Sequence, residues 1–136
     1  MTLRRRGREI ALHVLYQLDI SAGDPREVLD LYWENFTPPE KAREFCQRLL
    51  DGVLTNKEQL DRILEENSQN WTLKRMAVVD RNILRFAAFE LVFCPDIPFK
   101  ATLNEAIELA KKFGTEDSSA FINGILDKIQ SNLKPP

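Results

Sequence analysis

Apolar residues recur every three or four positions along almost the whole chain. This spacing places side chains on one face of an α-helix. The stripes are Ile10, Ala11, Val14, Leu15 and Leu18; Phe45, Leu49 and Val53; Leu60, Ile63 and Leu64; Val79, Ile83, Ala87 and Leu91; Ala106, Ile107, Ala110 and Phe113; Phe121, Ile122, Ile125, Leu126 and Ile129. No stretch of four or more residues alternates cleanly between apolar and polar and is bounded by turn residues. The pattern therefore predicts an all-α protein of six to eight helices joined by short loops, with no β-strand.

Several short motifs are typical of helix N-termini. Residues Asp24–Glu27 place a capping aspartate before a proline and a carboxylate, and Thr37–Glu40 repeat the arrangement. After the Pro95–Pro98 break, Thr102–Glu105 are predicted to form a third capping box. At Thr55–Glu58 two interpretations stay open. Either the stripe from Phe45 continues as one long helix, or a new helix is capped there.

The composition is that of an ordinary globular protein. The chain has 136 residues, of which 43% are hydrophobic and 29% charged, so we expect one domain with a sizeable core. The two cysteines, Cys46 and Cys94, lie in apolar segments and have no disulfide-framework or metal-ligand spacing. No apolar run approaches the ~20 residues of a membrane span. We therefore expect a protein of the reducing cytoplasm, without membrane contact.

Positive charge is concentrated at the N-terminus. Residues 1–13 carry a net charge of +3 within a chain of formal net charge -2. A targeting peptide, a solvated helix end and a surface for an anionic partner would each explain this. A secretory apolar region should be unbroken, but here His13, Gln17 and Asp19 interrupt it, which disfavours a signal peptide. The other two explanations stay open.

A helix over residues 4–20 would separate two faces. Opposite the apolar stripe, Arg5, Glu9, Leu12 and Tyr16 line up, with His13 at their edge. Arginines bind phosphates, and an exposed aromatic ring offers a platform for an unstacked base, as single-stranded RNA recognition requires. Packing of Tyr16 against a neighbouring helix is an equally good interpretation.

A second basic cluster could extend this surface, although such a cluster is more often simply solvated. It contains Lys74, Arg75, Arg81 and Arg85, the last two being one turn apart. We assign Arg85 to RNA and Arg81 to a protein partner.

Residues for catalysis are not found together. His13 is the only histidine, and the five glycines are scattered without forming a phosphate-binding motif. The carboxylates have the spacing of capped, solvated helix faces. We therefore expect a binding protein with no enzymatic activity, no cofactor and no metal site.

Three stretches resemble the NusB family of bacterial transcription antitermination factors. These are RRRGREIALHVLYQLD, VVDRNILRFAAFEL and DIPFKATLNEAIELAKKFGTEDSSAFINGILDKI. The resemblance covers residues 4–130 and is weakest between 21 and 45. It implies an all-α, NusB-like fold in which one domain, residues 1–136, contains two small helical bundles, about 4–70 and 71–132.

The resemblance also implies a function. NusB-like proteins pair with NusE, a small-subunit ribosomal protein, and the pair binds the single-stranded boxA element of nascent RNA. The complex joins RNA polymerase and supports processive transcription of ribosomal RNA operons. Some members form homodimers that hide the arginine surface, and the sequence leaves monomer and homodimer open.

The family's functional positions can be matched residue by residue. Those assigned to RNA are Arg4, Arg5, Arg6, Arg8, Tyr16 and Phe121. Tyr16 also matches a position beside NusE, and Asp80 matches an acidic position that resembles a salt-bridge site for NusE. Ala120 stands where many relatives have lysine, and Gly7 replaces an alanine, which should let the first helical turn fray by roughly 1 kcal/mol.

Two other functions remain as alternatives. The chain could be a helical adaptor that binds only protein. It could also be a stand-alone RNA-binding module, because it resembles the N-terminal domain of ribosomal RNA cytosine methyltransferases.

Overall fold

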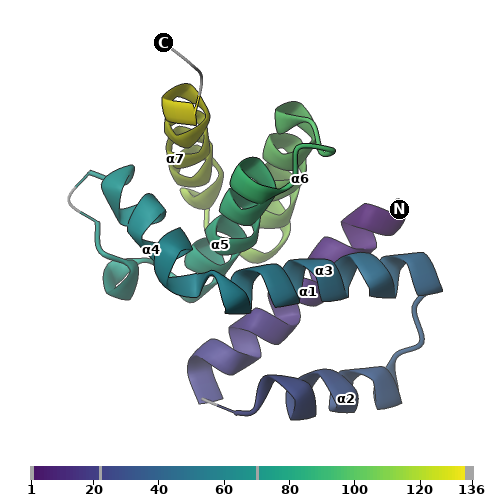
Figure 1. Cartoon of the computed structure of the whole chain (residues 1–136). Helices are drawn as coiled ribbons and strands as arrows, with labels where there is room; N and C mark the ends of the chain where they lie inside the picture. Colours follow the sequence, from purple (N-terminus) through teal and green to yellow (C-terminus); the bar gives the residue numbers. More distant parts are fainter. Residues whose placement is uncertain (1, 22, 70, 134–136) are drawn as a thin grey trace. The chain divides into compact units, whose positions relative to one another are not determined.

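The structure is a computed structural model that describes residues 2–21, 23–69 and 71–133. These residues form seven α-helices and one 3-10 helix and contain no strand, which confirms the all-α prediction (Figure 1). The helices are α1 (Leu3–Ser21), α2 (Pro25–Asn35), α3 (Glu40–Thr55), α4 (Lys57–Glu66), η1 (Leu73–Arg75), α5 (Val78–Phe93), α6 (Phe99–Phe113) and α7 (Ser118–Leu133).

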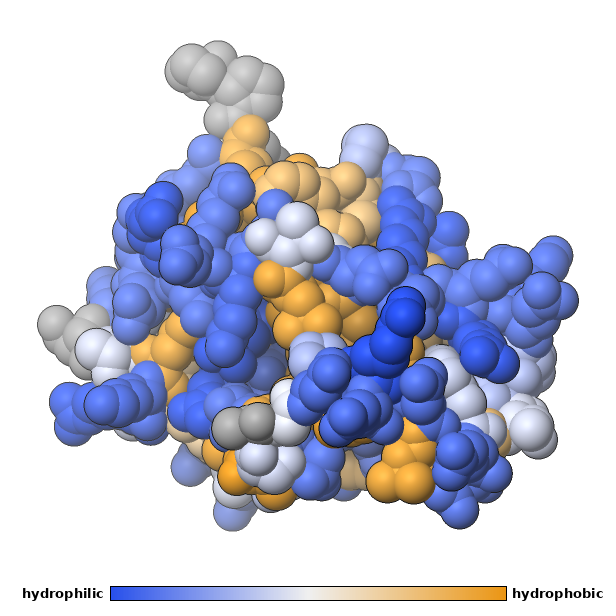
Figure 2. All heavy atoms as spheres, turned by 60° about the horizontal axis from the view of Figure 1, so that its bottom comes forward, coloured by the Kyte–Doolittle hydropathy of each residue, from blue (hydrophilic) through white to orange (hydrophobic). Residues whose placement is uncertain are grey.

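The chain forms two compact units that divide within α3, between Asp51 and Gly52. The first unit contains α1, α2 and most of α3, and the second contains the end of α3 and helices α4 to α7. The division into residues 4–70 and 71–132 that the resemblance implies stays a prediction. None of the described helices is both long and apolar enough to cross a membrane. On the face seen in Figure 2, hydrophilic residues surround smaller apolar areas.

The predicted helix starts have mixed outcomes. Asp24 caps α2 as expected, since its carboxylate accepts a hydrogen bond of 2.9 Å from the Arg26 N–H. The prediction that Thr37 caps the next helix is wrong, because α3 begins only at Glu40. There the Pro39 carbonyl accepts the first backbone hydrogen bonds of the helix.

The capping box predicted at Thr102 is also wrong. Helix α6 begins three residues earlier, at Phe99, with Pro98 at its N-cap. Thr102 is therefore inside the helix and buried, and its hydroxyl donates a 2.7 Å hydrogen bond to Glu90. A threonine that could cap a helix instead links α6 to α5.

The structure decides between the two interpretations at Thr55–Glu58. Helix α3 ends at Thr55 and α4 begins at Lys57, so a new helix starts there. Asn56 is at the N-cap, but its side-chain amide donates backwards to the Gly52 carbonyl, at 2.8 Å, rather than capping α4.

Gly7 lies where α1 and α3 approach closely in the first unit. A Cβ atom at Gly7 would lie 2.9 Å from the Ala42 carbonyl oxygen and 3.2 Å from the Cys46 backbone nitrogen. Because both are backbone atoms, they cannot move aside as the end of a flexible side chain can. Gly7 therefore allows two helices to pack closely. Helix α1 begins at Leu3, and the fraying expected from Gly7 stays a prediction.

Helix α5 is the most buried helix of the second unit, with every residue from 82 to 90 buried. The Arg85 guanidinium binds Asp61 of α4, with Nε–Oδ1 and Nη2–Oδ2 distances of 2.9 and 3.3 Å. It also donates to Asn82 at 3.0 Å. These hydrogen bonds connect α5 to α4, as Glu90 and Thr102 connect α5 to α6.

The same substitution at two glycines should have opposite effects on stability. Gly7→Ala should destabilise the protein by about 1 to 3 kcal/mol, because the new methyl group overpacks against backbone. Gly124→Ala should stabilise it by about 0.5 to 1 kcal/mol, because Gly124 lies inside α7 with no atom within 4 Å of an added Cβ. Urea unfolding measures both. A stabilising Gly7→Ala would contradict the packing described for α1 and α3.

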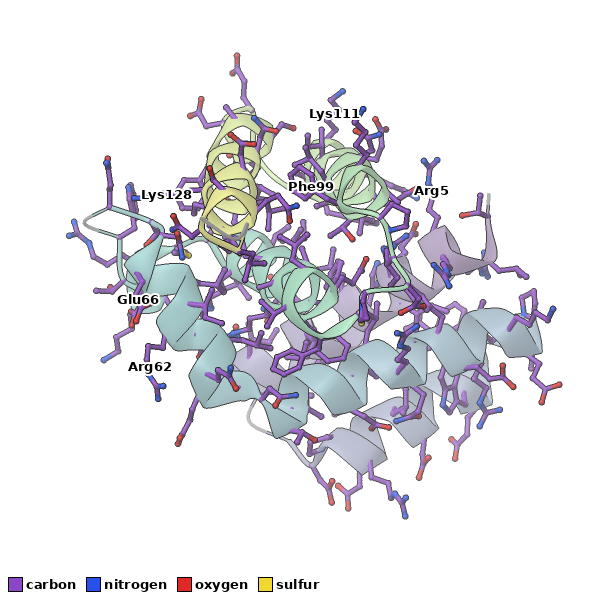
Figure 3. The ribbon with its side chains drawn as sticks, turned by 45° about the horizontal axis from the view of Figure 1, so that its top comes forward. Arg5, Arg62, Glu66, Phe99, Lys111 and Lys128 are labelled. Carbon is purple, nitrogen blue, oxygen red and sulfur yellow. The ribbon has the colours of Figure 1, made fainter. Side chains whose placement is uncertain are left out.

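Loss of the Arg85 side chain should destabilise the fold strongly. Arg85→Met leaves Asp61 without its partner, and we expect a loss of about 2 to 4 kcal/mol in urea unfolding. This loss is smaller than that expected for a fully buried ion pair, because 25% of the Asp61 side chain is exposed to solvent. Arg62→Met is the matched control, since Arg62 projects from α4 into solvent (Figure 3), and should change stability by less than ~0.5 kcal/mol.

Candidate nucleic-acid interface

The first two turns of α1 carry all four predicted N-terminal arginines. Thr2 caps this end, its hydroxyl accepting a 3.1 Å hydrogen bond from the Arg5 N–H. Arg4 and Arg6 are exposed, whereas Arg5 is half-buried and extends outward from the start of α1 (Figure 3). Arg8 differs from the other three, since only 3% of its surface is exposed.

Two of the arginines share one aromatic ring. The guanidinium carbons of Arg4 and Arg8 lie 5.2 and 5.1 Å from the centre of the Phe45 ring, on α3. Such contacts hold guanidinium groups over an aromatic face. Arg8 thereby contributes to packing inside the first unit, while the exposed Arg4 keeps surface available to a ligand.

Tyr16 is exposed at 39%, as its predicted role requires. It lies about 16 Å along the helix from Arg5, because α-helices rise 1.5 Å per residue. The prediction that Leu12 shares this exposed face is wrong, since Leu12 is only 2% exposed. Helix α1 contacts α3 at Gly7 and α2 at His13, so its buried face is wider than one stripe.

Asp80 lies in the first turn of α5 and is only 7% exposed. Its Oδ1 atom is the one buried side-chain oxygen or nitrogen among the described residues that has no hydrogen-bond partner. Burial raises the pKa of Asp80 above its ordinary value, and a hydrogen bond with Ser118 offsets part of this shift. A buried carboxylate oxygen without a partner is costly, and a cation brought to it would lower that cost.

Arg81 and Arg85 are both engaged within the second unit. Arg81 is half-buried and donates a 3.1 Å hydrogen bond to the Leu73 carbonyl. Arg85 is 7% exposed and bound to Asp61. Their assignments to a protein partner and to RNA stay predictions, and both residues also have a structural role.

Phe121 is half-buried on α7, one turn after Ser118. The structure therefore brings Phe121 near Asp80, which is hydrogen-bonded to Ser118. The Phe121 ring also meets the ring of Trp71 edge to face, with centroids 5.7 Å apart. The sequence interpretation missed Trp71, although its position just before Lys74 and Arg75 is a signal that could have found it. Ala120 is exposed, so this position offers no cation.

No group of three or more metal-ligand side chains occurs among the residues described. Both cysteines are buried, and no disulfide joins them. Burial, with a smaller effect of the Asp51 charge, raises the pKa of the Cys46 thiol to about 12, so it is protonated at neutral pH and a poor nucleophile.

Comparisons with known proteins identify the family of this chain. The sequence profile of the NusB family matches residues 5–131. The transcription antitermination protein NusB of Desulfatibacillum aliphaticivorans is 48% identical over 133 residues, which cover 98% of this chain and 93% of that protein.

Solved structures extend the similarity to the fold. NusB of T. maritima matches with a TM-score of 0.88 and 38% identity, over 99% of this chain and 95% of that one. A NusB chain solved with NusE and double-stranded RNA matches with a TM-score of 0.87 and 28% identity, over 97% of this chain and 98% of that one. The chain therefore belongs to the NusB family.

Proposed function

We propose that this protein is a transcription antitermination factor that binds single-stranded boxA RNA together with NusE. In the bacterial cytoplasm the pair would join RNA polymerase and support processive transcription of ribosomal RNA operons. The observation that carries the proposal is the arginine end of α1, with Arg4 and Arg6 exposed, in a member of a family of which one relative was solved with NusE and double-stranded RNA. The proposed role is binding, without catalysis.

The arginines that keep exposed surface are proposed to contact RNA phosphates. Arg4, Arg5 and Arg6 begin α1, where their guanidinium groups can reach an RNA backbone. Tyr16, further along the same helix, offers a partly exposed ring to a base. Phe121 is proposed to contribute a second ring from α7. Arg8 and Arg85 could reach RNA only by leaving the contacts described above.

The contact with NusE is proposed to involve Asp80, with Tyr16 and Arg81. An unpartnered carboxylate oxygen in a buried site favours a basic side chain from a partner, because ion pairing offsets the cost of burial. Asp80 lies in the first turn of α5, where the positive end of the helix dipole offsets part of the cost of burying its charged form.

Titration of the purified protein with boxA-like RNA, with and without NusE, tests the proposal. We expect weak binding by the protein alone, because its net charge is -2, and tighter, sequence-selective binding when NusE is present. An adaptor that binds only protein would bind NusE and leave the RNA affinity of NusE unchanged.

The salt dependence of RNA binding should separate exposed from buried arginines. Each phosphate contact to single-stranded RNA contributes about -0.7 to the slope of log K against log salt. Arg4→Ala and Arg6→Ala should each make the slope shallower by roughly 0.7 and weaken boxA-like and unrelated RNA alike. Arg8→Ala should mainly lower stability and leave the slope unchanged. If the salt slope is unchanged after all four N-terminal arginines are removed, RNA binds elsewhere on the protein.

Asp80→Asn should stabilise the free protein at neutral pH and weaken its binding to NusE. Burial raises the pKa of Asp80 from its ordinary value of 3.8, so the folded state favours the protonated form. The protonated Asp80 carboxyl therefore contributes its stabilisation fully below pH 3.8, and this contribution to the free energy of unfolding is lost as the pH rises through the raised pKa. The advantage of the neutral variant should therefore shrink on acidification.

Thermal unfolding across pH and calorimetric titration with NusE measure the two effects of Asp80→Asn. We expect a loss in NusE affinity of more than ~1 kcal/mol, and a larger loss for Asp80→Lys, which creates a like-charge contact. A variant that is less stable at pH 7 and binds NusE normally would show that Asp80 only stabilises the first turn of α5.

A further inference from the structure

We propose that Trp71, with Arg75, Phe121 and Lys128, forms a stacking platform for an unpaired RNA base on the second unit. This inference rests on the proposed function and adds a binding site remote in sequence from the α1 arginines. The resemblance to the family assigns no role to Trp71, Arg75 or Lys128.

Trp71 is a large aromatic side chain that stays 46% exposed. Its ring packs edge to face on Phe121, with centroids 5.7 Å apart and planes at 69°. The Arg75 guanidinium carbon lies 5.8 Å from the centre of the same ring. An indole with a cation beside it and much of its surface in solvent has the features that single-stranded RNA sites use.

Hydrogen bonds hold the Trp71 carbonyl and the residues that follow it. The Trp71 carbonyl accepts a 2.7 Å hydrogen bond from the Ser68 hydroxyl. Two residues later, the Leu73 N–H donates to the Glu65 carboxylate at 3.0 Å, and the Leu73 carbonyl accepts from Arg81. These contacts restrain the backbone at Trp71 and Leu73, which lowers the cost of ordering the ring when a base stacks on it.

Lys128 is the second cation of the proposed platform, and it lies on the same face of α7 as Phe121. Phe121, Lys128 and Asn132 are seven and four residues apart, which places them on one helix face. Phe121 contacts Trp71, and Asn132 donates a 2.7 Å hydrogen bond to Asn67 at the end of α4. Lys128, between them, projects on the side where the segment joining α4 to α5 lies (Figure 3).

The charges favour RNA over other ligands. Lys74, Arg75 and Lys128 are exposed cations, and no salt bridge between described residues involves them. Between Trp71 and Arg75 the chain has two cations and no carboxylate. A polyanion with flat bases matches this combination of aromatic surface and positive charge.

The second tryptophan provides a matched control within the chain. Trp33 on α2 also has a guanidinium over its ring, since Arg43 lies 4.7 Å from its centre. Trp33 is half-buried, whereas Trp71 is exposed. Helix α2 also carries Glu27, Asp30 and Glu34. The acidic helix repels phosphates, so Trp33 should not bind RNA.

Tryptophan fluorescence of single-tryptophan variants tests the platform. Trp33→Phe leaves Trp71 as the only reporter, and Trp71→Phe leaves Trp33. The probe is a short unstructured boxA-like RNA, added to the full-length protein in the presence of NusE. We expect quenching in Trp33→Phe and little quenching in Trp71→Phe. The same RNA annealed to its complement should quench Trp71 weakly, because its bases are already stacked.

Affinities of further variants complete the test. Trp71→Ala should weaken RNA binding roughly 5- to 150-fold with an unchanged salt slope, and Lys128→Ala should make the slope shallower by about 0.7. No RNA binding by the wild-type protein would overturn the proposed function and the platform together. Wild-type binding with no quenching of Trp71 and no effect of Trp71→Ala would overturn the platform alone. Loss of NusE affinity without loss of RNA affinity in Trp71→Ala would show that the ring binds protein, and would also overturn it.

Discussion

Helix α5 is buried at every residue from 82 to 90, and the charged side chains in this stretch must therefore be satisfied inside the second unit. Arg85 meets this requirement through Asp61 and Asn82, and Glu90 meets it through Thr102. These directional contacts fix α4 and α6 against α5. The positions of η1 and Trp71 follow, because Glu65 of α4 and Arg81 of α5 both bind Leu73.

Asp80 is the exception on this helix, and the exception indicates its role. It is as buried as Arg85, yet one of its carboxylate oxygens has no partner among the described residues. A protein keeps such a group only when something outweighs its cost, and a cation supplied by a partner protein is the simplest compensation. The same helix thus holds the unit together through Arg85 and Glu90, and we propose that it presents Asp80 to a partner protein.

The sequence predicts the all-α class, the cap at Asp24 and the basic end of α1, because local periodicity and charge decide these features. It fails where tertiary contacts override local pattern. Thr102 has the sequence of a cap but donates to Glu90, and Leu12 has a surface position on a single-stripe helix but is buried. Arg8 looks like its neighbours in sequence, and only the contact with Phe45 shows that it packs inward. Trp71 is separated from Phe121 by 50 residues, so no local pattern joins them.

Photo-crosslinking tests the proposed RNA surface most directly. BoxA-like RNA containing 4-thiouridine would be irradiated in complex with the protein and NusE, and the crosslinked residues identified by mass spectrometry. The proposed surface predicts crosslinks in α1 between Arg4 and Tyr16, and a second set at Trp71 and Phe121. Crosslinks confined to α2 or α6, with none at these two places, would contradict it.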